Sequence, residues 1–245
     1  MDTEHGTIFI RLYELLLESY GPRGWWPLLG RVGQPGFDAE GYHPGFEPEL
    51  SNTDRFEIAV GAILTQNTSW INVRRALGNL SRHVRDRFTM LSPEAVLDIG
   101  TEVLTGLIRS SGYYNQKARK LMMMSSMFAG IKGVPERDGL LNLWGIGPET
   151  ADSILLYAFD GPVFVIDAYT RRILSRVAGF ELDASDQVYH RLQSTIQNAL
   201  PRDTGLYREY HALLVEHGKN RCLKREPLCS DCPARGMCNY IVQKP

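Results

Sequence analysis

Residues 140–178 read LLNLWGIGPETADSILLYAFDGPVFVIDAYTRRILSRVA, and this stretch decides the fold of the chain. A short helical segment leads into a tight turn that contains Gly145 and Gly147, and the periodicity of apolar residues predicts a new helix over 149–159. Pro148 suits the first helical position, because its missing N–H would have no partner there. Two glycines before a helix leave N–H groups pointing outward, and such a site binds anions, for example a nucleic-acid phosphate. An ordinary glycine-capped helical corner is the alternative interpretation.

A second helix is predicted to begin directly after Asp167, which follows the apolar run 163–166. A carboxylate at this position is expected to be a helix N-cap, and the cap fixes its direction. With Asp167 in place, the chain resembles the helix-hairpin-helix glycosylases of the endonuclease III superfamily, whose signature is L-x-G-(I/V)-G-x-x-T-A followed by a helix-leading aspartate. The residues that match the hairpin are Leu143, Gly145, Ile146, Gly147, Thr150 and Ala151. The resemblance implies that Asp167 acts in catalysis.

One position departs from the pattern of the bifunctional members, which also cut the DNA backbone. Those enzymes carry a lysine two residues after the second hairpin glycine, and this lysine forms a Schiff base with the sugar. Here the position holds Glu149, and a carboxylate cannot form that bond. The expectation is a glycosylase without AP lyase activity, with Glu149 as a second candidate catalytic residue. A first-turn acid favoured by the helix dipole is the alternative interpretation of Glu149.

The resemblance also implies a set of DNA contacts. Gln66, in the turn after a predicted helix, is expected to fill the space left by an everted base. Tyr113, at the tip of a second loop, is expected to intercalate opposite the lesion. The hairpin residues Gly145, Gly147 and Thr150 complete the predicted DNA-binding set. The basic residues that follow Tyr113 are expected to bind DNA phosphates and so support this loop, or else to form an ordinary solvated helix face. They are Lys117, Arg119 and Lys120.

A candidate base pocket is predicted from aromatic residues. Residues 21–50 hold twelve glycines or prolines, and a loop of this length in a compact protein is usually functional or mobile. Trp25 and Trp26 lie in this loop, and with Phe56 they are expected to stack on a flipped base, most favourably on one that carries positive charge. The alternative is that the two tryptophans anchor the loop on the core.

All four cysteines lie in the last 24 residues, with the spacing Cys222-x6-Cys229-x2-Cys232-x5-Cys238. This clustering argues against a distributed disulfide framework and for a metal site. Four thiolates suit either tetrahedral zinc or a [4Fe–4S] cluster, and chemistry alone leaves the choice open. The spacing resembles that of the endonuclease III family cluster, and the resemblance implies a [4Fe–4S] cluster. Nearby basic residues are expected either to touch the DNA backbone or to form a solvated loop: Lys224, Arg225 and Arg235.

Composition limits the remaining possibilities. The 245-residue chain has a net charge of −1 and a pI near 6.6, so any DNA binding must rest on local basic patches. The sequence has no apolar run long enough to span a membrane and no charged-then-apolar leader. We therefore expect a soluble, monomeric, cytoplasmic and nucleoid-associated protein without a signal peptide.

Together these observations predict an all-α fold of two domains. One is a continuous helical domain over 52–162 that includes the hairpin, and the other joins 1–51 to 163–245 and carries the catalytic aspartate and the cluster. The expected function is that of a monofunctional DNA glycosylase in base excision repair. It would hydrolyse the N-glycosidic bond of a damaged base in double-stranded DNA, expected to be an alkylated purine such as 3-methyladenine. Two alternatives stay open: a mismatch (uracil or thymine) or oxidised-pyrimidine glycosylase, and a module that binds distorted DNA without catalysis.

Overall fold

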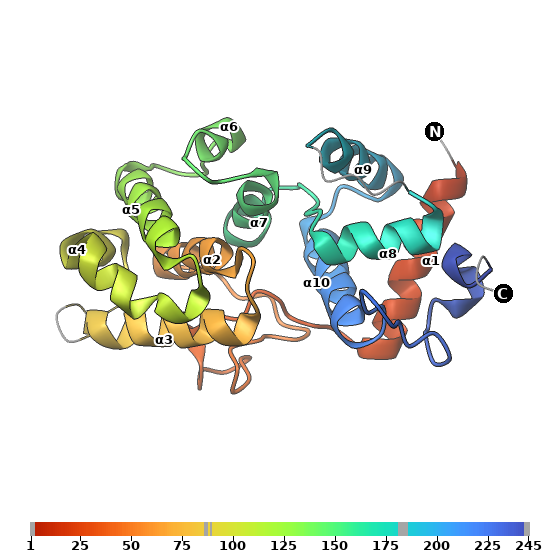
Figure 1. Ribbon diagram of the computed structural model, residues 1–245, viewed down its shortest axis with the longest axis horizontal. Helices are drawn as coiled ribbons and strands as arrows, with labels where there is room; N and C mark the ends of the chain where they lie inside the picture. The colour runs from red at the N-terminus through yellow and green to blue at the C-terminus, as the bar shows by residue number, and fades with distance from the viewer. Residues whose placement is uncertain (1–2, 86–87, 89, 181–185, 243–245) are drawn as a thin grey trace. The chain divides into compact units, whose positions relative to one another are not determined.

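The computed structural model describes residues 3–85, 88, 90–180 and 186–242. Within these ranges the chain forms α-helices and short 3-10 helices and contains no β-strand, which confirms the predicted all-α class. None of the helices in the described part of the chain is both long enough and apolar enough to span a bilayer. The chain divides into two compact units (Figure 1): a central unit, Trp26–Gly161, and a terminal unit, Met1–Trp25 with Pro162–Pro245.

The central unit is built around α2 (Asn52–Thr65), which is buried almost continuously from Phe56 to Leu64. The helix packs on α3, α5 and α7, and these helices surround it in Figure 1. The side chain of Ser51 accepts a hydrogen bond from the N–H of Asp54, and the Asp54 carboxylate accepts one from the N–H of Ser51, so a capping box begins the helix. The other helical elements of this unit are η1 (Leu29–Arg31), α3 (Trp70–Arg85), α4 (Pro93–Leu107), η2 (Arg109–Ser111), α5 (Tyr114–Gly130), α6 (Arg137–Leu141) and α7 (Pro148–Phe159).

The terminal unit is built around α10 (Thr204–Asn220), which packs on α1 (Thr3–Tyr20) and α8 (Ala168–Ala178). Its core is aromatic: the ring of Phe164 meets the rings of Tyr207 and Tyr210 edge to face at 5.4 and 5.7 Å. The remaining elements of this unit are α9 (Asp186–Ala199), η3 (Arg235–Met237) and α11 (Asn239–Val242).

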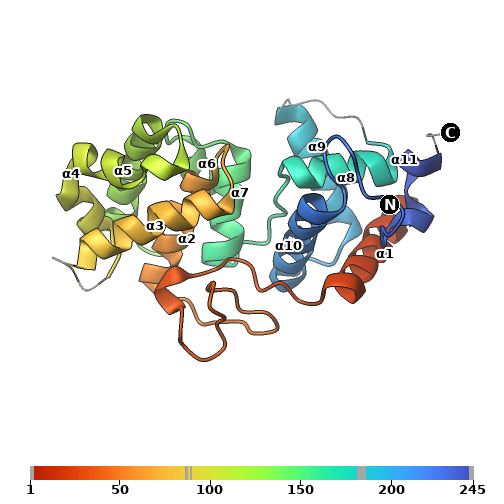
Figure 2. The same cartoon turned by 60° about the horizontal axis from the view of Figure 1, so that its bottom comes forward.

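The loop 26–51 belongs to the central unit, whereas the sequence analysis placed it with the chain ends. The Glu57 carboxylate accepts hydrogen bonds from the backbone N–H groups of Leu29 (2.5 Å) and Gly30 (3.1 Å). Arg31 also forms an ion pair with Asp54 at 2.6 Å. Figure 2 shows the loop running beneath α2 and α3. These contacts join the loop to α2, and no local signal in the loop sequence reports them.

Glu57 makes folding stability depend on pH. The residue is only 3% exposed, and burial raises the pKa of its carboxyl from 4.5 to about 7 even though the two N–H groups favour the charged form. Because its pKa is higher in the folded state than in the unfolded chain, protonated Glu57 favours folding. This contribution to the free energy of unfolding is fully present below pH 4.5 and is lost as the pH rises through about 7.

We therefore expect the free energy of unfolding to fall by about 3 kcal/mol more in the wild type than in Glu57→Gln as the pH rises from 5 to 8. Urea unfolding at several pH values measures this difference. Glu94→Gln removes an exposed carboxylate of the same unit and should keep the wild-type pH dependence. Equal slopes for the wild type and Glu57→Gln would contradict the prediction.

Candidate active site

The hairpin between α6 and α7 is fixed by a buried ion pair. The guanidinium of Arg137 on α6 donates to both carboxylate oxygens of Asp152 on α7, at 2.6 and 3.0 Å. Asp152 is fully buried and the Arg137 side chain is 27% exposed. A two-point contact of this kind fixes both distance and orientation. This pair could not be predicted from the sequence, because nothing in the sequence relates two positions 15 residues apart on different helices.

The two hairpin glycines have different roles. Gly145 has a φ of +77°, and a Cβ atom there would collide with the side chain of Lys120. Gly147 is the N-cap of α7 with an ordinary φ of −95°, and a Cβ atom there would have no described atom within 4 Å. Gly145 is thus required by the fold, while Gly147 leaves open space in front of a helix N-terminus, where an anion can approach.

Gln66 is held against this hairpin. As the C-cap of α2, its amide nitrogen donates to the backbone oxygen of Gly145 (3.2 Å) and to the hydroxyl of Thr150 (2.9 Å). Its amide oxygen accepts from Lys120 at 2.5 Å. The structure therefore brings three of the predicted DNA-binding residues together. Thr150 is only 6% exposed, so its position suits it to hold Gln66.

Tyr113 lies at the N-cap of α5 and is 66% exposed. Its backbone is left-handed, with a φ of +46°, and it follows Gly112, whose φ is +69°. An exposed aromatic ring on such a sharply turned backbone is suited to insertion between bases.

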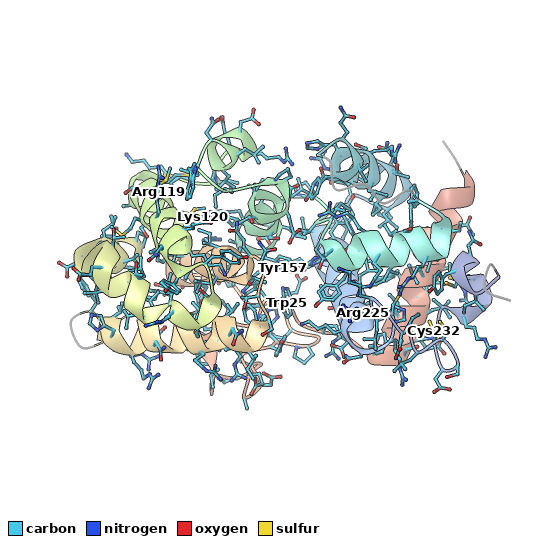
Figure 3. The ribbon with its side chains drawn as sticks, in the orientation of Figure 1. Trp25, Arg119, Lys120, Tyr157, Arg225 and Cys232 are labelled. Atoms are coloured by element: carbon cyan, nitrogen blue, oxygen red, sulfur yellow. The ribbon has the colours of Figure 1, made fainter. Side chains whose placement is uncertain are left out.

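The basic residues after Tyr113 have separate positions. Lys117 is only 1% exposed, so it cannot contact phosphates as predicted. Arg119 lies over the ring of Trp144 with its guanidinium carbon 4.3 Å from the ring centroid, and the Lys120 amine is 5.9 Å from the same centroid. Figure 3 shows Arg119 and Lys120 on α5. Trp144 is 44% exposed, and the hairpin pattern alone predicts no role for it.

Asp167 is the N-cap of α8 and is 9% exposed. One carboxylate oxygen accepts a hydrogen bond from the backbone N–H of Thr170 at 2.6 Å, and the other lies 3.7 Å from Nε2 of His211 on α10. Burial lowers the pKa of His211, and the nearby Asp167 carboxylate opposes this shift. The Thr170 N–H thus fixes the direction of this carboxylate, and the ring of His211 lies beside its other oxygen.

The three predicted pocket aromatics do not form one wall. Trp26 is 5% exposed and packs on the rings of Trp70 and Tyr157, and Phe56 is fully buried against Phe128. Both are core residues of the central unit, where packing covers their rings. This corrects the prediction for these two residues and agrees with the alternative that Trp26 anchors the loop.

Trp25 is half-buried in the terminal unit, and the amine of Lys219 lies 5.2 Å from the centroid of its ring. Burial lowers the pKa of Lys219, whereas the carboxylates of Glu216 and Asp167 oppose this shift. Lys219 is therefore an electrostatic neighbour of both Trp25 and Asp167. Glu149, by contrast, is exposed in the first turn of α7 on the central unit.

The cysteine loop docks on the helix that Asp167 caps. Arg172 donates to the backbone oxygens of Cys222 (2.8 Å) and Gly218 (2.9 Å). Arg176 lies 3.1 Å from the sulfur of Cys222 and donates to the backbone oxygen of Leu223 at 2.7 Å. Carbonyl groups in the last turn of α10 and in the loop that follows it therefore find their partners on α8.

None of the four cysteines forms a disulfide. Burial raises the pKa of Cys232 and of Cys238, and Cys222 and Cys229 add to both shifts, so the sulfurs are electrostatic neighbours. Backbone N–H groups also point at sulfur, from Ala234 to Cys232 and from Tyr240 and Ile241 to Cys238. Four thiols with N–H donors fit an iron–sulfur cluster chemically. In the described residues, however, no three His, Cys, Asp or Glu side chains are arranged to hold a metal ion.

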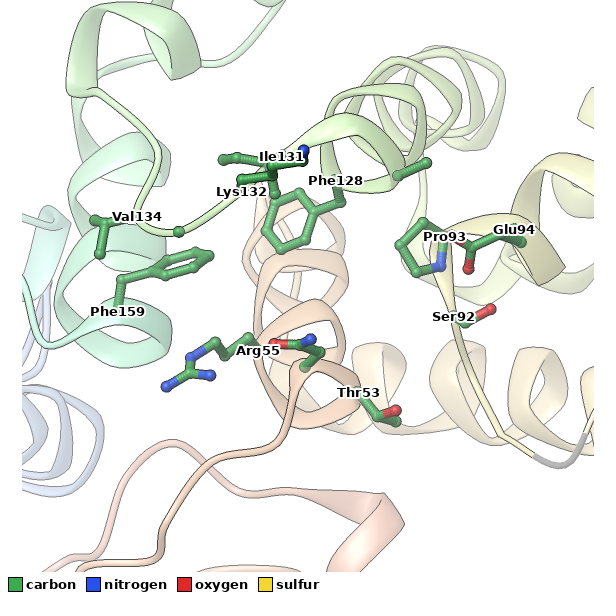
Figure 4. Close-up of a pocket in the computed structure, with 13 residues that line it drawn as sticks. Thr53, Arg55, Ser92, Pro93, Glu94, Phe128, Ile131, Lys132, Val134 and Phe159 are labelled. Atoms are coloured by element: carbon green, nitrogen blue, oxygen red, sulfur yellow. The ribbon is translucent and has the colours of Figure 1, made fainter.

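A cavity of about 640 Å³ lies at the other end of α2 (Figure 4). Arg55, Phe128 and Phe159 are among its lining residues, and none of the predicted site residues lines it. A helix of 14 residues is about 21 Å long, so this cavity is well separated from Gln66.

We expect the two hairpin glycines to respond differently to substitution by alanine. Gly145→Ala should cost about 1–2 kcal/mol of stability or more, because its left-handed backbone disfavours a Cβ atom and Lys120 must also move. Gly147→Ala should cost less, on the order of 0.5–1 kcal/mol, because alanine is a poorer N-cap than glycine although its Cβ atom would meet no described atom. Urea unfolding of both variants measures this, and equal losses would contradict the assignment.

The chain resembles known proteins over most of its length. The profile of the HhH-GPD superfamily of base excision DNA repair proteins matches residues 60–198. A candidate DNA repair glycosylase of Methanocaldococcus jannaschii is 38% identical over 240 residues, which cover 93% of this chain and 94% of that protein. Endonuclease III of Thermotoga maritima is 27% identical over 202 residues, covering 81% and 89%. The structure of H. pylori 3-methyladenine DNA glycosylase bound to 1,N6-ethenoadenine matches with a TM-score of 0.62 and 27% identity, covering 88% and 97%.

Proposed function

Because this chain belongs to the HhH-GPD superfamily of base excision DNA repair proteins, we propose that it is a monofunctional DNA glycosylase. It would hydrolyse the N-glycosidic bond of a damaged base flipped out of double-stranded DNA. The all-α helix-hairpin-helix glycosylase fold predicted from the sequence is confirmed. The observation that carries the proposal is the buried Asp167 carboxylate, which is held by the Thr170 N–H and lies beside the ring of His211.

The proposed mechanism assigns one step to each group. The open N-terminus of α7 at Gly147 takes a DNA phosphate through backbone N–H groups. Base flipping costs about a few kcal/mol, and Gln66 and Tyr113 fill the gap that it leaves. Gln66 must first release its hydrogen bonds to the hairpin. Asp167 then stabilises the positive charge that develops on the sugar and orients the attacking water, as carboxylates do in glycoside hydrolysis.

Two classes of damaged base are candidates. The sequence predicts an alkylated purine, and the likeness to the H. pylori enzyme supports that class. The Lys219 amine over Trp25 favours a neutral base instead, such as uracil, thymine or an oxidised pyrimidine. A cationic base stacked on Trp25 would share one ring with an ammonium group and would be repelled by it. A neutral base would not meet this repulsion.

The absence of lyase activity rests on Glu149, which occupies the hairpin position where bifunctional relatives carry a lysine. Two other amines need to be considered. Lys117 is buried and donates to two backbone carbonyls. Lys219 is an electrostatic neighbour of Asp167, so it is the amine whose participation an experiment must test.

We expect the wild type to release a free base from lesion-containing duplexes and to leave an intact abasic strand, which breaks only after alkali. Asp167→Asn should slow base release by on the order of 10²–10³-fold, because the charge that stabilises the transition state is lost. Asp203→Asn is the matched control. Asp203 caps α10 in the same unit, accepting from the N–H of Leu206 at 2.6 Å, and asparagine caps equally well. A duplex panel with 7-methylguanine, uracil, thymine opposite guanine and an oxidised pyrimidine compares the two base classes.

Borohydride trapping on the same duplexes tests for a covalent intermediate, and no adduct is expected. If the wild type were trapped efficiently and Lys219→Met were not, the assignment as monofunctional would be wrong. If no duplex in the panel lost its base, the alternative of a non-catalytic DNA-binding module would replace the proposal.

We also propose that Cys222, Cys229, Cys232 and Cys238 hold a [4Fe–4S] cluster. The support is the four-thiol donor set and the backbone N–H groups directed at its sulfurs. When bound, such a cluster would crosslink the loop that docks on α8. The residues of this chain alone carry out base removal in the proposed mechanism.

Purified protein should therefore be yellow-brown and contain about four irons per chain. Iron and sulfide analysis with visible absorption spectra measures this, and Cys229→Ser should lower the iron content. A colourless protein with a single zinc per chain, prepared without oxygen, would contradict the assignment.

A further inference from the structure

Lys117 is an ionisable group that the proposed mechanism does not use, although it is only 1% exposed. Its amine donates hydrogen bonds to the backbone oxygen of Leu64 at 2.8 Å and to that of Ser111 at 2.6 Å. Burial and the charge of Lys120 lower its pKa to about 8. Placing an ammonium group here is costly, so the two carbonyl contacts must offset the cost.

Both acceptors lie at the C-terminal ends of helices. Leu64 is in the last turn of α2, and Ser111 is the last residue of η2. Carbonyl groups at a helix C-terminus have no partner within the helix. At the end of the 14-residue α2 they also carry the negative end of the helix dipole. A single ammonium group therefore satisfies the ends of two helices that are 47 residues apart in the chain, and holds them together.

The turns that follow these carbonyls carry the two residues predicted to probe DNA. Gln66 comes two residues after Leu64, and Tyr113 comes two residues after Ser111. The backbone N–H of Lys117 also donates to the backbone oxygen of Tyr113 at 3.0 Å. Both turns contain a left-handed residue, Tyr113 in one and Asn67 in the other, so both are tightly bent.

We propose that Lys117 is a positioning residue that ties the Gln66 turn to the Tyr113 turn, so that both side chains enter a distorted duplex together. This inference rests on the proposed function. Lys117 is buried and would not touch DNA itself. Its effect should appear in recognition of a lesion and leave the general affinity for duplex DNA, which depends on the hairpin, unchanged.

The test compares an undamaged duplex with one that carries a tetrahydrofuran abasic analogue opposite 2-aminopurine. Lys117→Met keeps the apolar stem but removes both donors. Its affinity for the undamaged duplex should stay within about twofold of the wild type. Its affinity for the abasic duplex should fall about tenfold, because two side chains that the wild type holds in place must then be immobilised on binding. The change in 2-aminopurine fluorescence on binding should fall with it. Lys132→Met, at an exposed lysine of the same unit, should match the wild type in every measurement.

A double-mutant cycle separates positioning from a general loss of stability. Once Tyr113→Ala has removed the inserting ring, Lys117→Met should lower the preference for the abasic duplex much less than it does in the wild type. Fully additive losses would overturn the proposal. If Lys117→Met does not fold, Lys117→Gln replaces it. That side chain keeps a donor but is too short to reach both carbonyls, so it should show the same loss of preference, and a retained preference would overturn the proposal.

The failure of this inference is distinguishable from the failure of the proposed function. If the wild type does not prefer the abasic duplex, the proposed function is wrong and this inference falls with it. If the wild type prefers the abasic duplex and the folded Lys117→Met variant does so equally, only the role of Lys117 is wrong.

Discussion

The ends of the helices are the constraint on which this structure depends. In an all-helical chain, polar backbone groups without a partner collect at helix termini, and each must find one. Asp167 caps α8 with a carboxylate, Gly147 leaves the N-terminus of α7 open, and Lys117 serves the ends of α2 and η2. The proposed chemistry uses the same places. A carboxylate, an anion site and two bent turns are all consequences of how helices begin and end.

The buried ionisable side chains show how the chain offsets the cost of this arrangement. Asp152 is paired at two points with Arg137, Glu57 accepts two backbone N–H groups, and Lys117 donates to two carbonyls. Each would be strongly destabilising if its partner were removed. Each also joins segments that are distant in the sequence, so these contacts specify geometry as well as stability. The Asp152 pair fixes the hairpin, Glu57 fixes the 26–51 loop on α2, and Lys117 fixes the turns that carry Gln66 and Tyr113.

The terminal unit combines Asp167, the proposed catalytic residue, and the cysteine loop on one helix. Arg172 and Arg176 of α8 bind the backbone of the loop, while Asp167 caps the same helix. The cysteine loop and the Asp167 carboxylate are therefore both held in place by contacts with α8. Lys219 adds a positive charge beside Trp25.

The sequence by itself determined the features that depend on neighbouring residues. The apolar periodicity, Pro148 after the two glycines and Asp167 before α8 are local signals, because capping and turn formation act within about one helical turn. The cysteine spacing is local in the same sense. Only the tertiary structure decided which side chains are covered. It buried Trp26 and Phe56 in the core, joined the 26–51 loop to α2, and paired Arg137 with Asp152. Burial and pairing depend on segments that are distant in the sequence and are brought together by packing. The residues next to a side chain therefore do not reveal its partner.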